Sequence, residues 1–197
     1  ELSTGATINS GTESEFNTLL AHENNGQINI INQNLTVDSG TISVSTANEL
    51  DATTAGIVTA SIATDSTVDN LATLTGTNAY TIVIAAGDAT GSTASELTAI
   101  DNATTVVVDA TAVTEVTGSN SEINTLYGSG GVNELGDEII IVTNDLTVAE
   151  ANEIDLLTTG VVTATIVSSE SVEILKTLTG VNAYNITINT SDATSTT

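Results

Sequence analysis

Three aspartates recur in the same short context along the chain. Asp88, Asp109 and Asp192 each precede Ala-Thr and each follows a run rich in β-branched residues. If the strands that precede them stack in register, their carboxylates form a loose column, and calcium is the cation that such oxygen ligands bind. Aspartate also closes turns by accepting hydrogen bonds from its own following backbone. We therefore expect turns at these positions and keep the three aspartates as the calcium candidates.

The residue types that catalysis needs are scarce. His22 is the sole histidine, cysteine is absent, and Lys176 is the sole cation. A Ser–His–Asp triad would need His22, and no nucleophile-elbow motif lies near it. Acidic pairs that could cleave or eliminate sugars lack the Arg or Lys that usually neutralises such substrates. The sequence predicts no catalytic residues, no cofactor and no enzyme activity.

The charge balance restricts the partners. The formal net charge is −24 over 197 residues. Binding to nucleic acid needs several Lys or Arg side chains against phosphates, and so does electrostatic attachment to anionic lipid. No apolar stretch is long enough to insert into a bilayer. We expect the partners to be other copies of the chain or adjoining repeats.

Residues 42–90 recur as residues 146–194, shifted by 104 positions without a gap, with 25 of the 49 aligned pairs identical. Tandem repeats of this kind are typical of stacked architectures, in which each unit packs on its neighbours.

Smaller units are visible inside the repeat. Several begin with Ser or Thr followed three positions later by an acidic residue, which is the capping-box pattern of a helix N-terminus. The pairs are Thr12 and Glu15, Thr46 and Glu49, Ser66 and Asp69, Thr93 and Glu96, and Ser119 and Glu122. Glycine often follows the segments that we expect to be helical. We expect Gly56, Gly76, Gly160 and Gly180 to cap the C-termini of these helices.

A β-prone run follows each expected helix. The runs are 27–31, 57–62, 79–84, 104–109, 138–142, 161–166 and 183–188. Their alternation predicts Val58, Ala60 and Ile62 inside, like their copies Val162, Ala164 and Ile166, with Thr59 and Thr163 outside. Two longer spacings, at 39–44 and 128–138, are expected to be loops at one edge.

These elements predict an α/β solenoid. We expect about seven right-handed strand–short-helix coils of about 26 residues, with parallel pairing, in a single segment over residues 1–197. The four aromatic residues agree with a thin core filled by Val, Ile, Leu, Ala and Thr. An all-β parallel solenoid is the alternative.

Three stretches carry a resemblance to known repeats: ELDATTAGIVTASI, EIDLLTTGVVTATI and TASELTAIDNATTVVVDA. They resemble the Thr/Ala/Val/Asp-rich tandem repeats of giant secreted surface proteins of marine bacteria and cyanobacteria. The resemblance implies an extracellular, structural or adhesin-like role at the cell surface, as a stalk or surface-layer rod within a larger protein. Two alternatives stay open: a subunit of an extracellular or viral filament assembled end to end, and a calcium- or carbohydrate-binding module.

Overall fold

The computed structural model describes residues 8–85 and 91–189. Short strands alternate with short helices, and the described strand pairs are parallel. The chain divides into two compact units. The described part of unit 1 is 8–85, 96–110 and 131–133, and that of unit 2 is 91–95, 111–130 and 134–189. The predicted α/β class is confirmed, and the all-β alternative is wrong.

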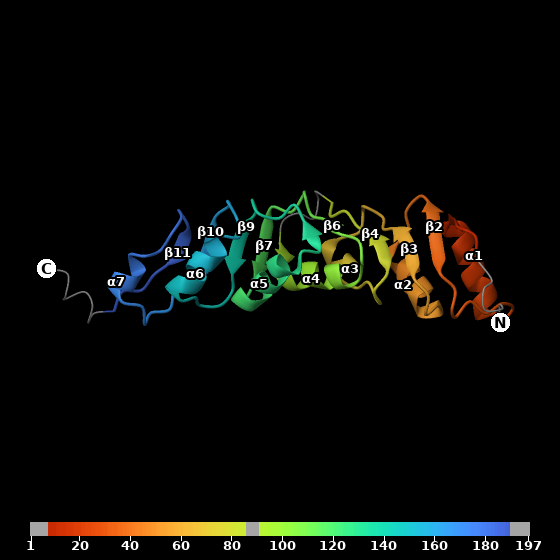
Figure 1. Ribbon diagram of the computed structural model, residues 1–197, viewed down its shortest axis with the longest axis horizontal. Helices are drawn as coiled ribbons and strands as arrows, with labels where there is room; N and C mark the ends of the chain where they lie inside the picture. The colour runs from red at the N-terminus through yellow and green to blue at the C-terminus, as the bar shows by residue number, and fades with distance from the viewer. Residues whose placement is uncertain (1–7, 86–90, 190–197) are drawn as a thin grey trace. The chain divides into compact units, whose positions relative to one another are not determined.

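Unit 1 is built on two parallel sheets (Figure 1). The larger sheet has the order β1 (Gly11–Thr12), β2 (Leu35–Ser39), β3 (Val58–Ser61) and β4 (Ala79–Thr81). The smaller sheet pairs β6 (Val108–Asp109) with β8 (Val132–Asn133). The helices are α1 (Glu13–Asn24), α2 (Val44–Thr53), α3 (Val68–Leu71) and α4 (Ala94–Asn102), whose first two residues belong to unit 2.

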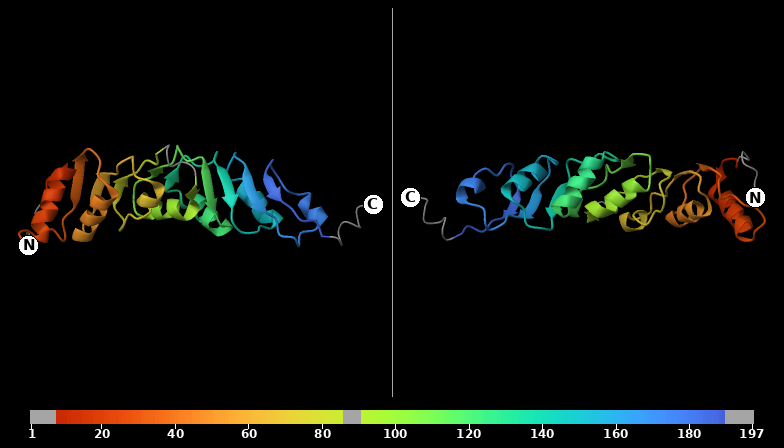
Figure 2. Two further views of the ribbon diagram at one scale, coloured as in Figure 1. Left: turned by 180° about the vertical axis from the view of Figure 1, so that it is seen from behind. Right: turned by 60° about the horizontal axis from the view of Figure 1, so that its bottom comes forward.

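Unit 2 contains one five-stranded parallel sheet. Its order is β5 (Ser92–Thr93), β7 (Glu115–Gly118), β9 (Ile139–Val142), β10 (Val162–Thr165) and β11 (Ala183–Asn185). Its helices are α5 (Asn120–Ser129), α6 (Val148–Asp155) and α7 (Val172–Leu175). The further views in Figure 2 show this alternation of strand and helix along the chain.

Strand pairing joins residues that are 20 to 27 positions apart. Gly11 pairs with Val37, 26 positions later, whereas Thr59 pairs with Ala79 and Thr163 with Ala183, each 20 positions later. A crossover helix between parallel strands needs a connection of about this length. The repeat at 104 positions is therefore also a repeat of register.

The predicted inward positions are confirmed. Val58, Ala60 and Ile62 expose at most 4% of their surface, and their copies at 162, 164 and 166 expose at most 5%. Thr59 and Thr163 are exposed. Because alternate side chains of a strand point to opposite faces, one buried row fixes the register of each strand.

The helix starts were predicted in part. Thr12 and Ser119 form capping boxes with Glu15 and Glu122, as expected. Thr46 and Ser66 are not N-caps, because the N-cap of α2 is Ser43 and the N-cap of α3 is Thr67. Each of these segments offers more than one hydroxyl, and burial of the apolar residue that follows the true cap, Val44 or Val68, decides between them. A further capping box, Thr147 with Glu150, was not predicted.

Two predictions about strands and loops at the N-terminal end were wrong. Residues 27–31 form no strand: Ile30 is buried, Ile31 is half exposed, and Asn29 Oδ1 accepts the Ile31 N–H in a local turn. The strand is β2, further along. Residues 39–44 are not a peripheral loop, because Ile42 is fully buried and bridges to Ile62. The stretch 128–138 also contains the end of α5 and all of β8.

The glycines at 56, 76, 160 and 180 do not cap helices. The C-caps of α2, α3, α6 and α7 are Thr54, Ala72, Leu156 and Lys176. Gly56 and Gly160 instead allow a close approach of neighbouring backbone, because a Cβ on either would lie 2.3 Å from the carbonyl oxygen of Gln33 or Glu138.

Candidate functional site

A hydrogen-bond network of polar side chains occurs twice, 104 positions apart. The two sets are Asn48, Asp51, Thr75 and Asn78 in unit 1, and Asn152, Asp155, Thr179 and Asn182 in unit 2.

Local structure places the four residues of the first network. Asn48 and Asp51 lie three positions apart on α2 and therefore share one face of the helix. Thr75 and Asn78 come from the turn between α3 and β4. Gly76 permits that turn, because its φ is +68° and a Cβ there would lie 2.1 Å from Asp51 Oδ1.

Each polar group of the first network has a partner. Asn48 donates its side-chain amide to the Thr73 carbonyl at 2.9 Å and accepts the Thr75 N–H at 3.0 Å. One carboxylate oxygen of Asp51 accepts the Thr75 hydroxyl at 2.8 Å, and the other accepts the Asn78 amide at 2.8 Å. The network therefore fastens the turn before β4 to the helix before β3.

Asn78 extends the network into the sheet. Its side-chain oxygen accepts the Val58 N–H at 2.9 Å, and the residue is only 2% exposed. In unit 2, Asn182 donates to Asp155 at 2.6 Å and accepts the Val162 N–H at 2.8 Å. A buried amide with both ends satisfied fixes one arrangement of neighbouring segments, because any shift leaves a polar group unpaired.

A tyrosine closes each network. The hydroxyl of Tyr80 donates to the Ala47 carbonyl at 3.3 Å, and that of Tyr184 donates to the Ala151 carbonyl at 3.4 Å. Burial raises the pKa of Tyr80 above its usual range, and the Asp51 charge raises it further. Burial and Asp155 also raise the pKa of Tyr184, against the Asn182 hydrogen bond. Both phenols therefore stay neutral donors at physiological pH.

Buried threonines that follow the helices in the sequence form a second set of repeated hydrogen bonds. The Thr54, Thr104 and Thr158 hydroxyls donate to the carbonyls of Gln33, Tyr80 and Glu138 at 2.6–2.7 Å. These carbonyls lie 20 to 24 positions earlier, which is one strand spacing. Each threonine thus ties one strand–helix repeat to the repeat before it.

The hydrogen bonds of these two networks link backbone segments and side chains of the protein itself. Each contains one carboxylate, and its two oxygens already accept hydrogen bonds from the protein. Within residues 8–85 and 91–189, no group of three His, Cys, Asp or Glu side chains has a geometry that could hold a metal ion.

The calcium candidates can be placed only in part. Asp109 lies in β6, where its N–H donates to the Ile82 carbonyl and its own carbonyl accepts the Ile84 N–H. Asp88 and Asp192 lie outside the described residues. The predicted aspartate column therefore stays a prediction.

His22 lies in the last turn of α1, and its Nδ1 is hydrogen-bonded to Gln27 Oε1. A histidine in the last turn complements the partial negative charge of a helix C-terminus.

Sequence reasoning missed the buried carboxylate of Glu138. The residue is 1% exposed, one of its carboxylate oxygens accepts the Tyr127 hydroxyl, and the other accepts the N–H groups of Gly136 and Asp137. No signal marked it, because it stands in the acidic, glycine-rich stretch that predicted a loop. With both oxygens satisfied, it organises the turn before β9.

Other polar surface features are simple. An open depression on unit 1 is lined by Glu23, Asn24, Ile31 and residues 52–55. Within the described residues, Glu23 Oε2 is buried and has no hydrogen-bond partner.

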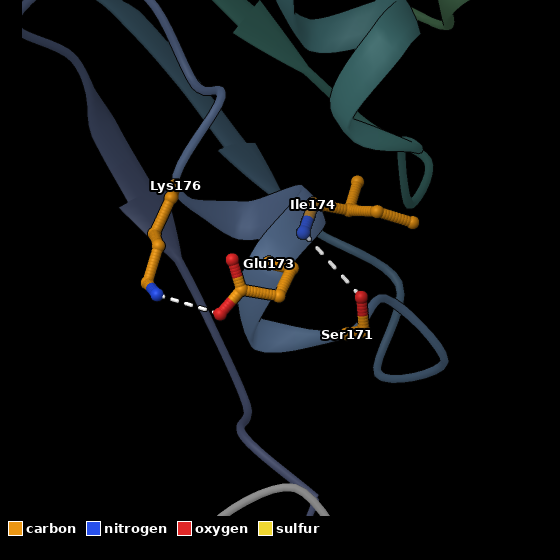
Figure 3. A network of polar contacts seen from close by, with 4 residues as sticks. All are labelled: Ser171, Glu173, Ile174 and Lys176. Atoms are coloured by element: carbon orange, nitrogen blue, oxygen red, sulfur yellow. Dashed lines mark hydrogen bonds and ion pairs between the residues drawn. The ribbon is translucent and has the colours of Figure 1, made fainter. Parts of the chain in front are cut away.

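Polar contacts around α7 are shown in Figure 3. The Ser171 hydroxyl accepts the Ile174 N–H at 3.4 Å, and Lys176 pairs with Glu173 at 2.7 Å. That ion pair is well exposed and so contributes little to stability.

The comparisons with known proteins give no relative. No family model, no curated protein and no solved structure matches the chain. Across the described ranges, no helix combines the length and the apolar character that crossing a bilayer requires.

Proposed function

We propose that the chain is a structural repeat segment of an extracellular protein: a single right-handed α/β solenoid, over residues 1–197, that provides length and surface. It serves as an adhesin, stalk or surface-layer rod within a larger secreted protein, and it is not an enzyme. The observation that carries the proposal is the duplicated network of Asn78, which is buried, and Asn182, which is half-buried, because each asparagine bonds one repeat to the next.

The hydrogen-bond partners support this role. In a catalytic or ligand-binding site, polar side chains converge on a space that a ligand fills. Here the side chains of Asp51, Asn78 and Thr104 form hydrogen bonds with the protein's own backbone and side chains. A repeat protein needs such bonds because each unit contacts only its neighbours and cannot bury its core alone.

The charge and composition support an exposed location. With a net charge of −24 and one Lys, the surface repels anionic lipid and nucleic acid and stays soluble. Absence of Cys and Met leaves no side chain that is readily oxidised at sulfur. Together with the resemblance to secreted surface repeats, these properties favour the cell surface.

A filament subunit is the second candidate, and one observation favours it. The apolar residues Ile186 and Ile188, which follow the last described strand, are 41% and 54% exposed. End-to-end assembly would cover such side chains.

One experiment tests both. An antibody raised against the chain is applied to intact and to lysed cells that produce it, and the native polypeptide that it recognises is sized under denaturing conditions. A polypeptide much larger than 19.9 kDa, labelled on intact cells, agrees with the surface rod. A polypeptide near 19.9 kDa in extracellular assemblies favours the filament. Labelling only after lysis contradicts both.

A further inference from the structure

Two copies of one strand differ in burial although their apolar residues are the same. Tyr80, Ile82 and Ile84 are at most 2% exposed in unit 1. Their copies are exposed or half-buried in unit 2, where Tyr184 is half-buried, Ile186 is 41% exposed and Ile188 is 54% exposed. The sequences AYTIVI and AYNITI present the same residues at these positions, so the difference lies in what covers them.

Residues 102–109 cover the first copy. Asn78 donates its N–H to the Ala103 carbonyl and accepts from Thr105 N–H, and Ile84 donates to the Asp109 carbonyl. The Thr104 hydroxyl accepts the Tyr80 N–H at 3.0 Å and donates to the Tyr80 carbonyl at 2.7 Å. This segment, which begins at the end of α4, thus supplies hydrogen-bond partners for the outer edge of β4, and its apolar residues Ala103 and Val108 are buried.

The second copy presents the same edge with its cover missing from the described structure. β11 is the last strand of its sheet (Figure 1), and among residues 8–85 and 91–189 none takes the place of Thr104 beside Tyr184. The face formed by Leu175, Tyr184, Ile186 and Ile188, here called the β11 face, combines a strand edge with uncovered apolar side chains.

We propose that the β11 face is the docking site of one more coil with the sequence type of residues 94–110, placed after β11 in chain order and parallel to it. This deepens the proposed function and rests on its stacked repeats. The partner is identified by what covers the first copy: a threonine that bonds the tyrosine backbone, as Thr104 does, and apolar residues such as Ile100, Ala103 and Val108, which are at most 3% exposed.

A second copy of the chain fits this face less well. Its first described repeat already buries Phe16 and Leu20, and among residues 8–34, before β2 begins, Ile31 is the one large apolar side chain that is exposed. An uncovered apolar face gains little from meeting a polar one, because the stabilisation scales with the apolar area removed from water on both sides.

The test extends the chain by its own sequence. Ser195, Thr196 and Thr197 align with Gly91, Ser92 and Thr93 at the repeat offset, so ASELTAIDNATTVVVDA, the sequence of residues 94–110, is appended directly after Thr197. The control extension carries Ile100→Asp and Thr104→Ala in the appended copy. Hydrogen exchange of residues 79–84 and 183–188 is measured in each protein, with the molar mass from light scattering.

We expect the appended coil to slow amide exchange of residues 183–188 at least about tenfold, toward the protection of residues 79–84, and the control extension to leave it unchanged. Equal protection of 79–84 and 183–188 in the unextended monomer would overturn the proposal. So would protection that the control extension also gives. Protection of the unextended chain that grows with concentration would assign the face to a second copy instead.

Failure of this proposal can be told from failure of the proposed function. If the extension leaves 183–188 unprotected while Asn78→Ala still destabilises the chain, the bonds between repeats stand and only the docking coil is wrong. If Asn78→Ala has no effect either, the stacked structural role itself is wrong.

Discussion

The side-chain amide of Asn78 donates to Asp51 Oδ1 at 2.8 Å, and the same bond recurs 104 positions later between Asn182 and Asp155 at 2.6 Å. The two asparagines differ in their surroundings. Asn78 is 2% exposed, whereas Asn182 is half-buried. Comparing Asn78 with Asn182 therefore tests the same asparagine–aspartate hydrogen bond in a buried and in a half-buried setting.

Asn78→Ala should lower the free energy of unfolding by about 2–4 kcal/mol, because it leaves the Val58 N–H and one Asp51 oxygen without their buried partner. Asn182→Ala should cost less than half of that, since water reaches the groups it leaves behind. Urea denaturation of both variants measures the difference. Equal losses would show that the repeats are covered to the same extent in solution.

Sequence patterns predicted the periodic features well. Strict alternation placed Val58, Ala60 and Ile62 in the core. The S/T-x-x-E pattern located the N-caps Thr12 and Ser119 but failed at Thr46, because α2 begins one turn earlier, after Ser43. Both signals are local, since a strand face and a capping box depend only on residues a few positions apart.

Features that depend on a neighbouring repeat were not predictable. Gly56 resembles a C-cap in the sequence, yet its role is to let the backbone of Gln33 approach, and Asn78 and Thr104 resemble ordinary turn residues. Their partners lie 20 to 27 positions earlier, and one sequence does not reveal which polar residues face that neighbour. Glu138 was missed for a different reason: its carboxylate partners, Tyr127, Gly136 and Asp137, are close in sequence, but its burial depends on how the turn before β9 folds back.

Ile62→Asp should lower the free energy of unfolding by about 3–5 kcal/mol, because the site is 3% exposed and offers no cation to pair with a buried carboxylate. Thr59→Asp, three residues away on the outer face of β3, is the matched control and should change stability by less than about 0.5 kcal/mol, apart from added charge repulsion. Thermal unfolding followed by circular dichroism compares the two. A larger effect at Thr59 would contradict the register of β3.

The capping box of α6 should make part of the stability depend on pH. The Thr147 backbone N–H and hydroxyl lower the pKa of Glu150, so the charged carboxylate stabilises the fold above the unfolded pKa of about 4.5, and this contribution is lost as pH falls through the folded pKa. Wild type should be more stable than Glu150→Gln by a fraction of 1 kcal/mol at about pH 6.5, because Glu150 is partly exposed and solvent screens its charge. The gap should close near about pH 3.

Urea denaturation at the two pH values checks this, with Glu153→Gln as a control for the change in net charge on the same helix. A gap that persists at the lower pH, or an equal one for Glu153→Gln, would remove the capping carboxylate as its cause.

Salt should stabilise the chain through screening. A net charge of −24 produces self-repulsion, which shrinks as the Debye length falls to about 8 Å at physiological ionic strength. Thermal melts in sodium chloride and in calcium chloride, at matched ionic strength and against EDTA, should give equal shifts if aspartates serve only turns. An extra calcium shift that Asp109→Asn removes, alone or combined with changes at Asp88 and Asp192, would assign a calcium site to these residues.

Gly56→Ala and Gly128→Ala should change the free energy of unfolding in opposite directions. Gly56→Ala places a Cβ 2.3 Å from the Gln33 carbonyl oxygen, where rigid backbone must move, and should cost at least about 2 kcal/mol. Gly128 lies inside α5 without a positive φ, and a Cβ there would meet no atom within 4 Å, so Gly128→Ala should stabilise by about 0.5–1 kcal/mol through helix propensity. Gly160→Ala repeats the first test in unit 2, since its Cβ would meet the Glu138 carbonyl oxygen at the same 2.3 Å. Unfolding of all three variants in urea decides the matter: if Gly56→Ala and Gly160→Ala are as mild as Gly128→Ala, the close backbone approach between successive repeats does not exist in solution.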